Sequence, residues 1–148
     1  MHEKEENQMG DVLTLAKYIV TKCVRDCCPI SNLQLQKILY FIQVDALKTT
    51  GEPAFLNNIE AWQFGPVVPE VYYYFCGFGA MPIFSTYESD CILENKEMID
   101  SIIEEKRLLD PWVLVEETHK DGGAWSQIYK DGEGNHNIIP VDLMRKAG

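Results

Sequence analysis

LQLQKILYFIQ, residues 33–43, and EAWQFGPVVPEVY, residues 60–72, are the two stretches of this sequence that decide its fold. The first places apolar side chains on two faces of a helix, with glutamines and a lysine between those faces. The second has a Trp-Gly-Pro turn and then a helix that begins at a proline. Neither has the pattern of a phosphate-binding loop, a metal site or a nucleophile elbow. Together they indicate the rigid scaffold of a binding protein rather than an enzyme.

The first stretch lies in a helix that we predict to run from Ser31 to about Thr49. Ser31 and Gln34 form a capping-box pattern at its start, and Gly51 supplies a left-handed stop. One apolar arc of this helix comprises Leu35, Ile38, Leu39, Ile42 and Ala46, and the opposite arc comprises Leu33, Tyr40, Phe41, Val44 and Leu47. A helix that is apolar on two sides needs neighbours on both, so we expect it to be central and buried.

Three polar residues of this helix lie between the apolar arcs. Gln36 and Gln43 are seven residues apart and share one face. A buried amide without a partner costs about 1–3 kcal/mol, so we expect both glutamines to hydrogen-bond the backbone of neighbouring segments. Lys37 is predicted to be a partly buried cation that bridges to loop carbonyls or to a carboxylate.

The segment before the central helix predicts an amphipathic helix with Asp11 as its N-cap and Pro29 beyond its end. Its apolar stripe consists of Val12, Leu15, Ala16, Ile19, Val20, Cys23, Val24 and Cys27. Cys23 and Cys27 are therefore predicted to be core residues. The five cysteines form a poor disulfide framework because their number is odd and two are adjacent. Their C-x3-C-C cluster lacks a second ligand pair for zinc, so we expect free thiols and no metal.

The second stretch predicts a short strand at Ile59 to Phe64, a turn at Gly65-Pro66, and a helix from Pro69. This helix is predicted to end at either Gly77 or Gly79.

Four consecutive aromatic residues, Tyr72, Tyr73, Tyr74 and Phe75, lie within that helix. At about 100° per residue they cannot all face the core, so at least one should be exposed. Exposed aromatic side chains are typical anchors of protein interfaces, although an outward tyrosine also occurs on ordinary surfaces. We predict that these four residues form the partner-binding patch.

The rest of the chain predicts a loop over Met81 to Asp90, where Ile83 and Phe84 are candidates for a second short strand. A helix should start at Glu94 or Asn95. Asp110-Pro111 is a cap followed by a proline in the first helical position, so another helix should cover Trp112 to about Thr118. These two helices are alternatively one kinked helix. A last helical turn is predicted near Pro140.

We therefore expect a mainly α fold, with a single compact domain of about five to six helices around the central helix from Ser31 to Thr49. A minor β element is expected near Ile59 to Phe64. The length of 148 residues and the hydrophobic share of 46% fit one globular domain, here residues 11–148. Residues 1–10 are predicted to be a flexible leader. That leader is polar and acidic, and no apolar run approaches membrane-spanning length, so a cytoplasmic protein is expected.

The net charge of −10 is uneven along the chain. Residues 1–50 carry six acidic and six basic side chains, whereas residues 51–100 carry eight acidic ones and a single lysine. Such a field repels phosphate backbones, so we expect no direct binding of nucleic acid. It favours a basic partner and speeds that partner's arrival, although acidity also serves solubility alone.

The sequence offers one candidate for a catalytic residue, His119, with Glu116 or Glu117 as its acidic partner. A histidine just after a helix end is more often a structural residue, because imidazole can satisfy the last carbonyls. A general base also needs a nucleophile and an orienting group, and the sequence offers neither. We therefore predict no catalytic residue and no cofactor.

The motifs quoted above resemble those of the Panacea domain family, which includes SocA-like antitoxins and phage-associated GepA-type proteins. The resemblance covers roughly residues 11–145 and departs from the family pattern mostly at residues 81–94 and 121–123. It rests on Leu35-Gln36-Lys37-Ile38-Leu39-Tyr40-Phe41 with Gln43, on Glu60 to Tyr72, and on Thr118-His119 followed by Trp125.

The resemblance implies a mostly helical antitoxin that neutralises a toxin protein encoded beside it by direct binding. It also implies a role seen in at least one relative, which delivers its toxin to a ClpXP-type protease. Residues implied to shape the common scaffold are Gln36, Lys37, Tyr40, Gln43, Trp62, Gly65, Pro66, Pro69, His119 and Trp125. The acidic middle segment and the tyrosine run would then select the partner.

Two alternatives to the antitoxin remain at this stage. The first is a phage or mobile-element regulator, or a protease adaptor, that binds a host protein through the same scaffold. The second is a small hydrolase that uses His119. Homo-oligomerisation is left open.

Overall fold

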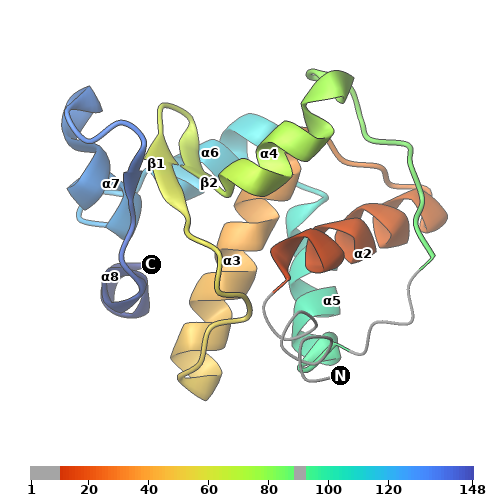
Figure 1. The fold of residues 1–148 in the computed structure, drawn as a ribbon, viewed down its shortest axis with the longest axis horizontal. Coiled ribbons are helices and arrows are strands. Elements are labelled where there is room, and N and C mark those ends of the chain that lie inside the picture. Colours follow the sequence, from red (N-terminus) through yellow and green to blue (C-terminus); the bar gives the residue numbers. More distant parts are fainter. Residues whose placement is uncertain (1–10, 89–92) are drawn as a thin grey trace.

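A long central helix organises the fold. The computed structural model describes residues 11–88 and 93–148, and the predicted leader lies outside the described residues. Helix α3 (Asn32–Thr50) runs through the middle of the molecule (Figure 1). On one side of it lie α2 (Val12–Arg25) and α5 (Lys96–Lys106), and on the other lie α7 (Ala124–Tyr129) and α8 (Val141–Ala147). The described residues form seven α-helices and one small sheet, so the predicted mainly α single domain is confirmed with one helix more than expected.

Local signals in the sequence fix both ends of α3. The backbone N–H of Ser31 donates to Oε1 of Gln34 at 3.0 Å, and the N–H of Gln34 donates to Oγ of Ser31 at 3.3 Å. Gly51 then ends the helix with a φ of 81°, a left-handed conformation that glycine adopts without strain. Both predicted caps of the central helix are therefore confirmed.

The two apolar arcs of α3 are covered by different neighbours. The helix packs against α2, α4, α5, α6, α8 and strand β2. Leu35, Ile38, Leu39 and Ile42 have no exposed surface, while Tyr40 and Leu47 of the opposite arc are 3% and 1% exposed. A helix with two apolar arcs buried in this way is held by neighbours on both sides, which accounts for its central position.

Helix α2 (Val12–Arg25) begins as predicted, because the side chain of Asp11 accepts a hydrogen bond from the N–H of Leu13. Its end differs from the prediction. Cys23 is fully buried, but Cys27 is exposed and has a φ of 57°. The helix stops at Arg25, so the apolar periodicity no longer applies at Cys27, and its predicted core role is wrong.

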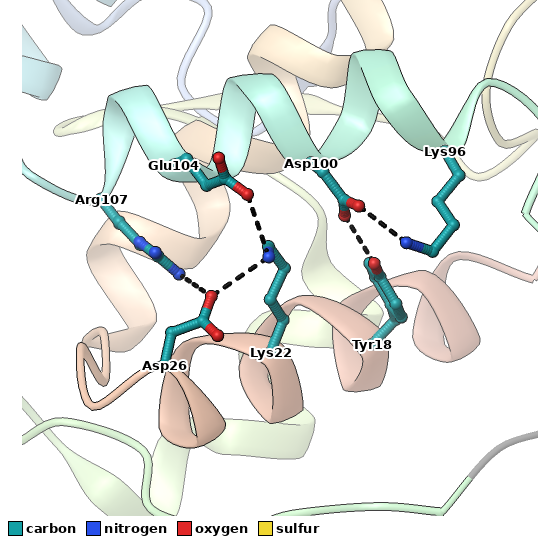
Figure 2. Close-up of polar contacts among 7 residues, drawn as sticks. All are labelled: Tyr18, Lys22, Asp26, Lys96, Asp100, Glu104 and Arg107. Atoms are coloured by element: carbon teal, nitrogen blue, oxygen red, sulfur yellow. Dashed lines mark hydrogen bonds and ion pairs between the residues drawn. The ribbon is translucent and has the colours of Figure 1, made fainter.

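A ladder of polar contacts joins α2 to α5 (Lys96–Lys106), as Figure 2 shows. It is formed by Tyr18, Lys22 and Asp26 with Lys96, Asp100, Glu104 and Arg107. Burial and the hydrogen bond to Asp100 raise the pKa of Tyr18. Burial alone would raise the pKa of Asp100, but Lys96 and Tyr18 outweigh it and hold that pKa below its usual range. The ladder ties α5 to α2 along the length of both helices.

The sheet has three short antiparallel strands in the order β2-β1-β3. They are β1 (Glu60–Trp62), β2 (Gly65–Val67) and β3 (Asn137–Ile138). The hairpin turn lies at Gln63 and Phe64, so the turn predicted at Gly65-Pro66 is wrong. Pro66 is tolerated inside a strand because β2 is at the edge of the sheet and needs no N–H there.

Helix α4 (Pro69–Phe75) starts at Pro69 as predicted and continues as a 3-10 turn, η1 (Cys76–Phe78). Gly79, with a φ of 59°, ends this turn, which decides between the two predicted stops. Ile83 is buried and donates its N–H to the carbonyl of Ile30 at 2.8 Å. The segment around it has no strand assignment, so the optional second strand at Ile83-Phe84 is not formed.

The C-terminal half completes the fold with three more helices. α6 (Pro111–Thr118) is separate from α5 and is capped by Asp110, which excludes the single kinked helix. α7 (Ala124–Tyr129) and a 3-10 turn, η2 (Lys130–Gly132), lead to β3, and α8 (Val141–Ala147) packs against α3. Within residues 11–88 and 93–148, no helix combines the length and the apolar character that a bilayer span requires.

Candidate functional site

Two buried amides fix the position of α4 on the central helix. Oε1 of Gln36 accepts the N–H of Val68 at 2.9 Å, and its Nε2 donates to Oδ1 of Asn32 at 2.9 Å. Asn32 in turn donates to the carbonyl of Tyr72 at 3.0 Å. Since Gln36 is 1% exposed, these bonds satisfy an amide that burial would otherwise penalise. The predicted hydrogen bonding of Gln36 to a neighbouring backbone is confirmed.

Gln43 makes the same kind of bridge two turns further along α3. Its Nε2 donates to the carbonyl of Phe55 at 2.9 Å, and its Oε1 accepts the N–H of Ala54 at 2.8 Å. The side chain is 1% exposed, so it ties the loop before β1 to α3 without contact with solvent. This prediction is confirmed as well.

Lys37 is more deeply buried than the sequence indicated. Its side chain has no exposed surface, and Nζ donates to the carbonyl of Pro66 at 3.0 Å. Among the described residues no carboxylate forms an ion pair with it. Removal from water lowers the pKa of Lys37 to about 7. The sequence predicted that Lys37 bridges to a carbonyl or to a carboxylate, and the structure shows the carbonyl.

Gly65 makes room for the end of this lysine. Its φ is 114°, and a Cβ added there would lie 2.9 Å from Cε of Lys37 and 2.8 Å from Oγ1 of Thr118. Glycine is therefore required both by the backbone conformation and by the close approach of α3 and α6. Tyr40, one turn further along the same side of α3, is 3% exposed, and burial raises the pKa of its hydroxyl to about 12.

His119 and Trp125 form a second part of the predicted scaffold. Their rings stack with centroids 3.6 Å apart, and the indole N–H of Trp125 donates to the carbonyl of Trp62 at 2.7 Å. Burial, followed by the charge of Lys37, lowers the pKa of His119, and its Nε2 is buried without a hydrogen-bond partner in the described structure. This environment favours a neutral, stacked imidazole.

The acids proposed beside His119 for hydrolysis are directed elsewhere. Glu116 and Glu117 are exposed, and Glu117 pairs with Lys106 at 2.8 Å. Within the described residues, no group of three His, Cys, Asp or Glu side chains could hold a metal ion. The contacts described around His119 therefore support a structural role for it.

The tyrosine run is divided among three environments. Tyr72 is half-buried against Trp62, with ring centroids 5.1 Å apart, whereas Tyr73 is 60% exposed. Tyr74 is turned toward α2, where Nζ of Lys17 lies 5.1 Å from its ring. Phe75 is 1% exposed and belongs to the core. Phe75 is therefore not available to a partner, because the helical period directs it inward.

An open groove of about 480 Å³ lies beside Tyr72, between α3, the β-hairpin, α4 and the start of α6. Its aromatic lining residues are Trp62, Phe64, Tyr72, Trp112 and His136. The rings of Phe64 and Trp112 contact each other edge to face, with centroids 5.4 Å apart. The imidazole of His136 stacks on Trp62, with ring centroids 4.3 Å apart.

The sequence did not single out Phe64, Trp112 or His136 as site residues. Their approach depends on the hairpin turn, which the sequence misplaced, and on the packing of α6 beside β2, which leaves no local pattern. Phe64, an aromatic residue directly before a Gly-Pro pair, was a local signal that could have pointed to the groove.

The fold is thus a small helical domain with an open groove lined by aromatic side chains. The model of the SocA-like antitoxin family, Panacea domain, matches residues 35–126. The chain is 34% identical over 156 residues to "Antitoxin SocA" of Caulobacter vibrioides, a match that covers 97% of this chain and 82% of the relative. The chain belongs to the SocA-like antitoxin family with a Panacea domain. No solved structure matches it.

Proposed function

We propose that this chain is a cytoplasmic antitoxin that neutralises a cognate toxin protein by binding it directly. Its family and the name of its relative support an antitoxin role. The observation that carries direct binding is the exposed aromatic surface around the hairpin, where Phe64 is 47%, Tyr73 60% and Trp112 56% exposed. Exposed aromatic clusters of this kind are typical of protein interfaces.

Electrostatics support a basic toxin. The chain carries a net charge of −10, and most of the excess lies in residues 51–100, which include the hairpin and α4. Complementary charge raises the rate of encounter between partners and disfavours wrong ones. Carboxylates outside the groove would then form the rim of the interface.

Inhibition in this proposal is steric and needs no bond-making step by the antitoxin. Stacking of His119 on Trp125 supports this, because a half-buried imidazole whose Nε2 has no hydrogen-bond partner among the described residues lacks the orienting contact that a general base needs.

Co-expression provides the test. The small reading frame adjacent to the gene of this chain should be lethal when expressed alone and harmless when this chain is present. The two products should co-purify as a complex of fixed stoichiometry. Lethality that persists with a well-expressed, folded chain, or rescue without any complex, would reject direct neutralisation.

The same pair of proteins separates inhibition from delivery to a protease. Binding that abolishes toxin activity in a purified two-component mixture supports steric neutralisation. Binding that leaves the toxin active until a ClpXP-type protease is added would support the adaptor alternative instead.

A further inference from the structure

We propose that the groove between the β-hairpin, α4 and α6 receives an apolar, uncharged segment of the toxin. In this proposal Phe64 and Trp112 are the main contact wall, and the exposed end of the tyrosine run is peripheral. The inference rests on the proposed function, since it names the part of this chain that holds the toxin and the chemistry of what the toxin inserts.

The aromatic wall is the first reason. Phe64 from the hairpin turn and Trp112 from the first turn of α6 lie with their ring centroids 5.4 Å apart. About half of each side chain is nevertheless exposed to solvent. Trp62 is held in place beside them by stacking on His136 and by the hydrogen bond from its Nε1 to Glu60 at 2.9 Å. Rigid, partly exposed aromatic side chains bury a large area at small entropic cost when a partner covers them.

The base of the groove is preorganised. Asn32 and Gln36 line it and are already hydrogen-bonded to the backbone around α4, and Lys37 is bonded to the carbonyl of Pro66. A partner therefore meets a base whose three buried polar side chains are already hydrogen-bonded and do not need to rearrange. Binding to such a surface loses less conformational entropy than binding to a mobile one.

Charge selects the class of occupant. Lys37 is the one formally charged residue among those that line the groove, and none of the described lining residues is an aspartate or a glutamate. In a chain of net charge −10 this is a local exception. A lysine or arginine inserted here would lose its hydration, meet no carboxylate and lie near the buried lysine. The groove therefore favours uncharged apolar side chains, and basic parts of the toxin would contact the acidic surface outside it.

At the edge of the sheet formed by β2, a partner can insert side chains into the groove but cannot add a strand. The strand β2 is an edge strand, but Pro66 has no N–H and its carbonyl is occupied by Lys37. A toxin strand could not extend the sheet there, because the backbone groups it would need are missing or used. A volume of about 480 Å³ is within the range of sites that enclose large apolar groups.

The test compares variants inside the groove with equally exposed residues outside it. Phe64→Ala and Trp112→Ala remove the wall, and Ala80→Trp fills the groove from an exposed lining position. Phe84→Ala is the matched control, because Phe84 is 58% exposed, close to the 56% of Trp112, but does not line the groove. Calorimetric titration of the purified toxin, the product of the lethal adjacent reading frame, measures Kd, and circular dichroism checks folding.

The expected result is a rise in Kd of about 30-fold or more for Trp112→Ala and Ala80→Trp, with a change below about 5-fold for Phe84→Ala. The rise for Trp112→Ala should be the same at about 50 mM and about 500 mM salt, because an uncharged occupant is not screened. If Trp112→Ala folds poorly, Phe64→Ala and Ala80→Trp decide.

Wild-type affinity in the folded groove variants overturns the proposal while leaving the proposed function intact. A loss for Trp112→Ala that disappears at high salt overturns the uncharged occupant. A wild-type homodimer that Trp112→Ala converts to a monomer assigns the groove to a second copy of this chain and also overturns it. Failure of the wild-type chain to bind the toxin rejects the proposed function itself.

Discussion

Replacement of Lys37 by methionine should stabilise the protein at neutral and acidic pH and destabilise it at high pH. Burial lowers the pKa of Lys37 from 10.5 to about 7, and at about 1.36 kcal/mol per pH unit this corresponds to a cost of about 5 kcal/mol for the buried charge. Methionine has a similar shape and removes that cost. It also leaves the carbonyl of Pro66, which Nζ meets at 3.0 Å, without its partner, at a cost of about 1–3 kcal/mol.

The pH dependence follows from the direction of the pKa change. Because folding lowers the pKa of a base, the unfolded chain binds more protons between pH 7 and 10.5, so this lysine's destabilising effect is fully present below pH 7 and fades as pH rises. Below pH 7 Lys37→Met should therefore be about 2–4 kcal/mol more stable than the wild type. Above pH 10.5 it should be about 1–3 kcal/mol less stable, with a crossover at about pH 8–10.

Urea unfolding of both proteins at several pH values measures this difference, and the exposed lysine Lys48 provides the control substitution Lys48→Met. The control should change the free energy of unfolding by less than about 1 kcal/mol. A Lys37→Met variant that is destabilised by the same amount at every pH would refute the reasoning, because it would mean that no uncompensated charge is buried in the folded protein.

Three further substitutions test the scaffold. Gly65→Ala should destabilise the protein by about 2–4 kcal/mol, because its φ is 114° and the new Cβ would lie 2.8 Å from a threonine hydroxyl. The control Gly77→Ala has open space around it and should be nearly neutral in the same urea titration. Gln43→Leu should lower the free energy of unfolding by about 2–4 kcal/mol, because three backbone groups of Ala54 and Phe55 lose their partner. An unchanged midpoint of urea unfolding would contradict this. Asp100→Asn should flatten the loss of stability on acidification, which thermal melting from pH 6 to 2 measures. Folding lowers the pKa of Asp100, so the stability that its carboxylate contributes is present above the pKa of the unfolded chain and is lost as pH falls through the pKa of the folded chain.

Elements with local signals were predictable from the sequence. The caps of α3, the start of α2 at Asp11 and the start of α6 at Asp110-Pro111 depend on hydrogen bonds within a few residues, and all are confirmed. The bonds of Gln36 and Gln43 were also predictable, because a polar residue between two apolar arcs must be buried and therefore needs a partner.

What the sequence did not yield depends on tertiary contacts. The hairpin turn was misplaced because Gly65-Pro66 is a turn pattern, and its place in an edge strand reflects the approach of Lys37 and Thr118 to Gly65. The groove was missed because Phe64 and Trp112 are far apart in the sequence and meet only after α6 packs beside β2. Such pairs leave no periodicity in a single sequence.

The most direct test of the central claim is a titration of purified toxin with this chain, with toxin activity as the readout. If the chain acts as a docking surface, activity should fall linearly and reach zero at a fixed whole-number ratio. The toxin should then be recovered active and unchanged in mass after the complex is separated. Inactivation by amounts of the chain far below that ratio, or a toxin of altered mass, would show that the chain acts as a catalyst and would contradict the account.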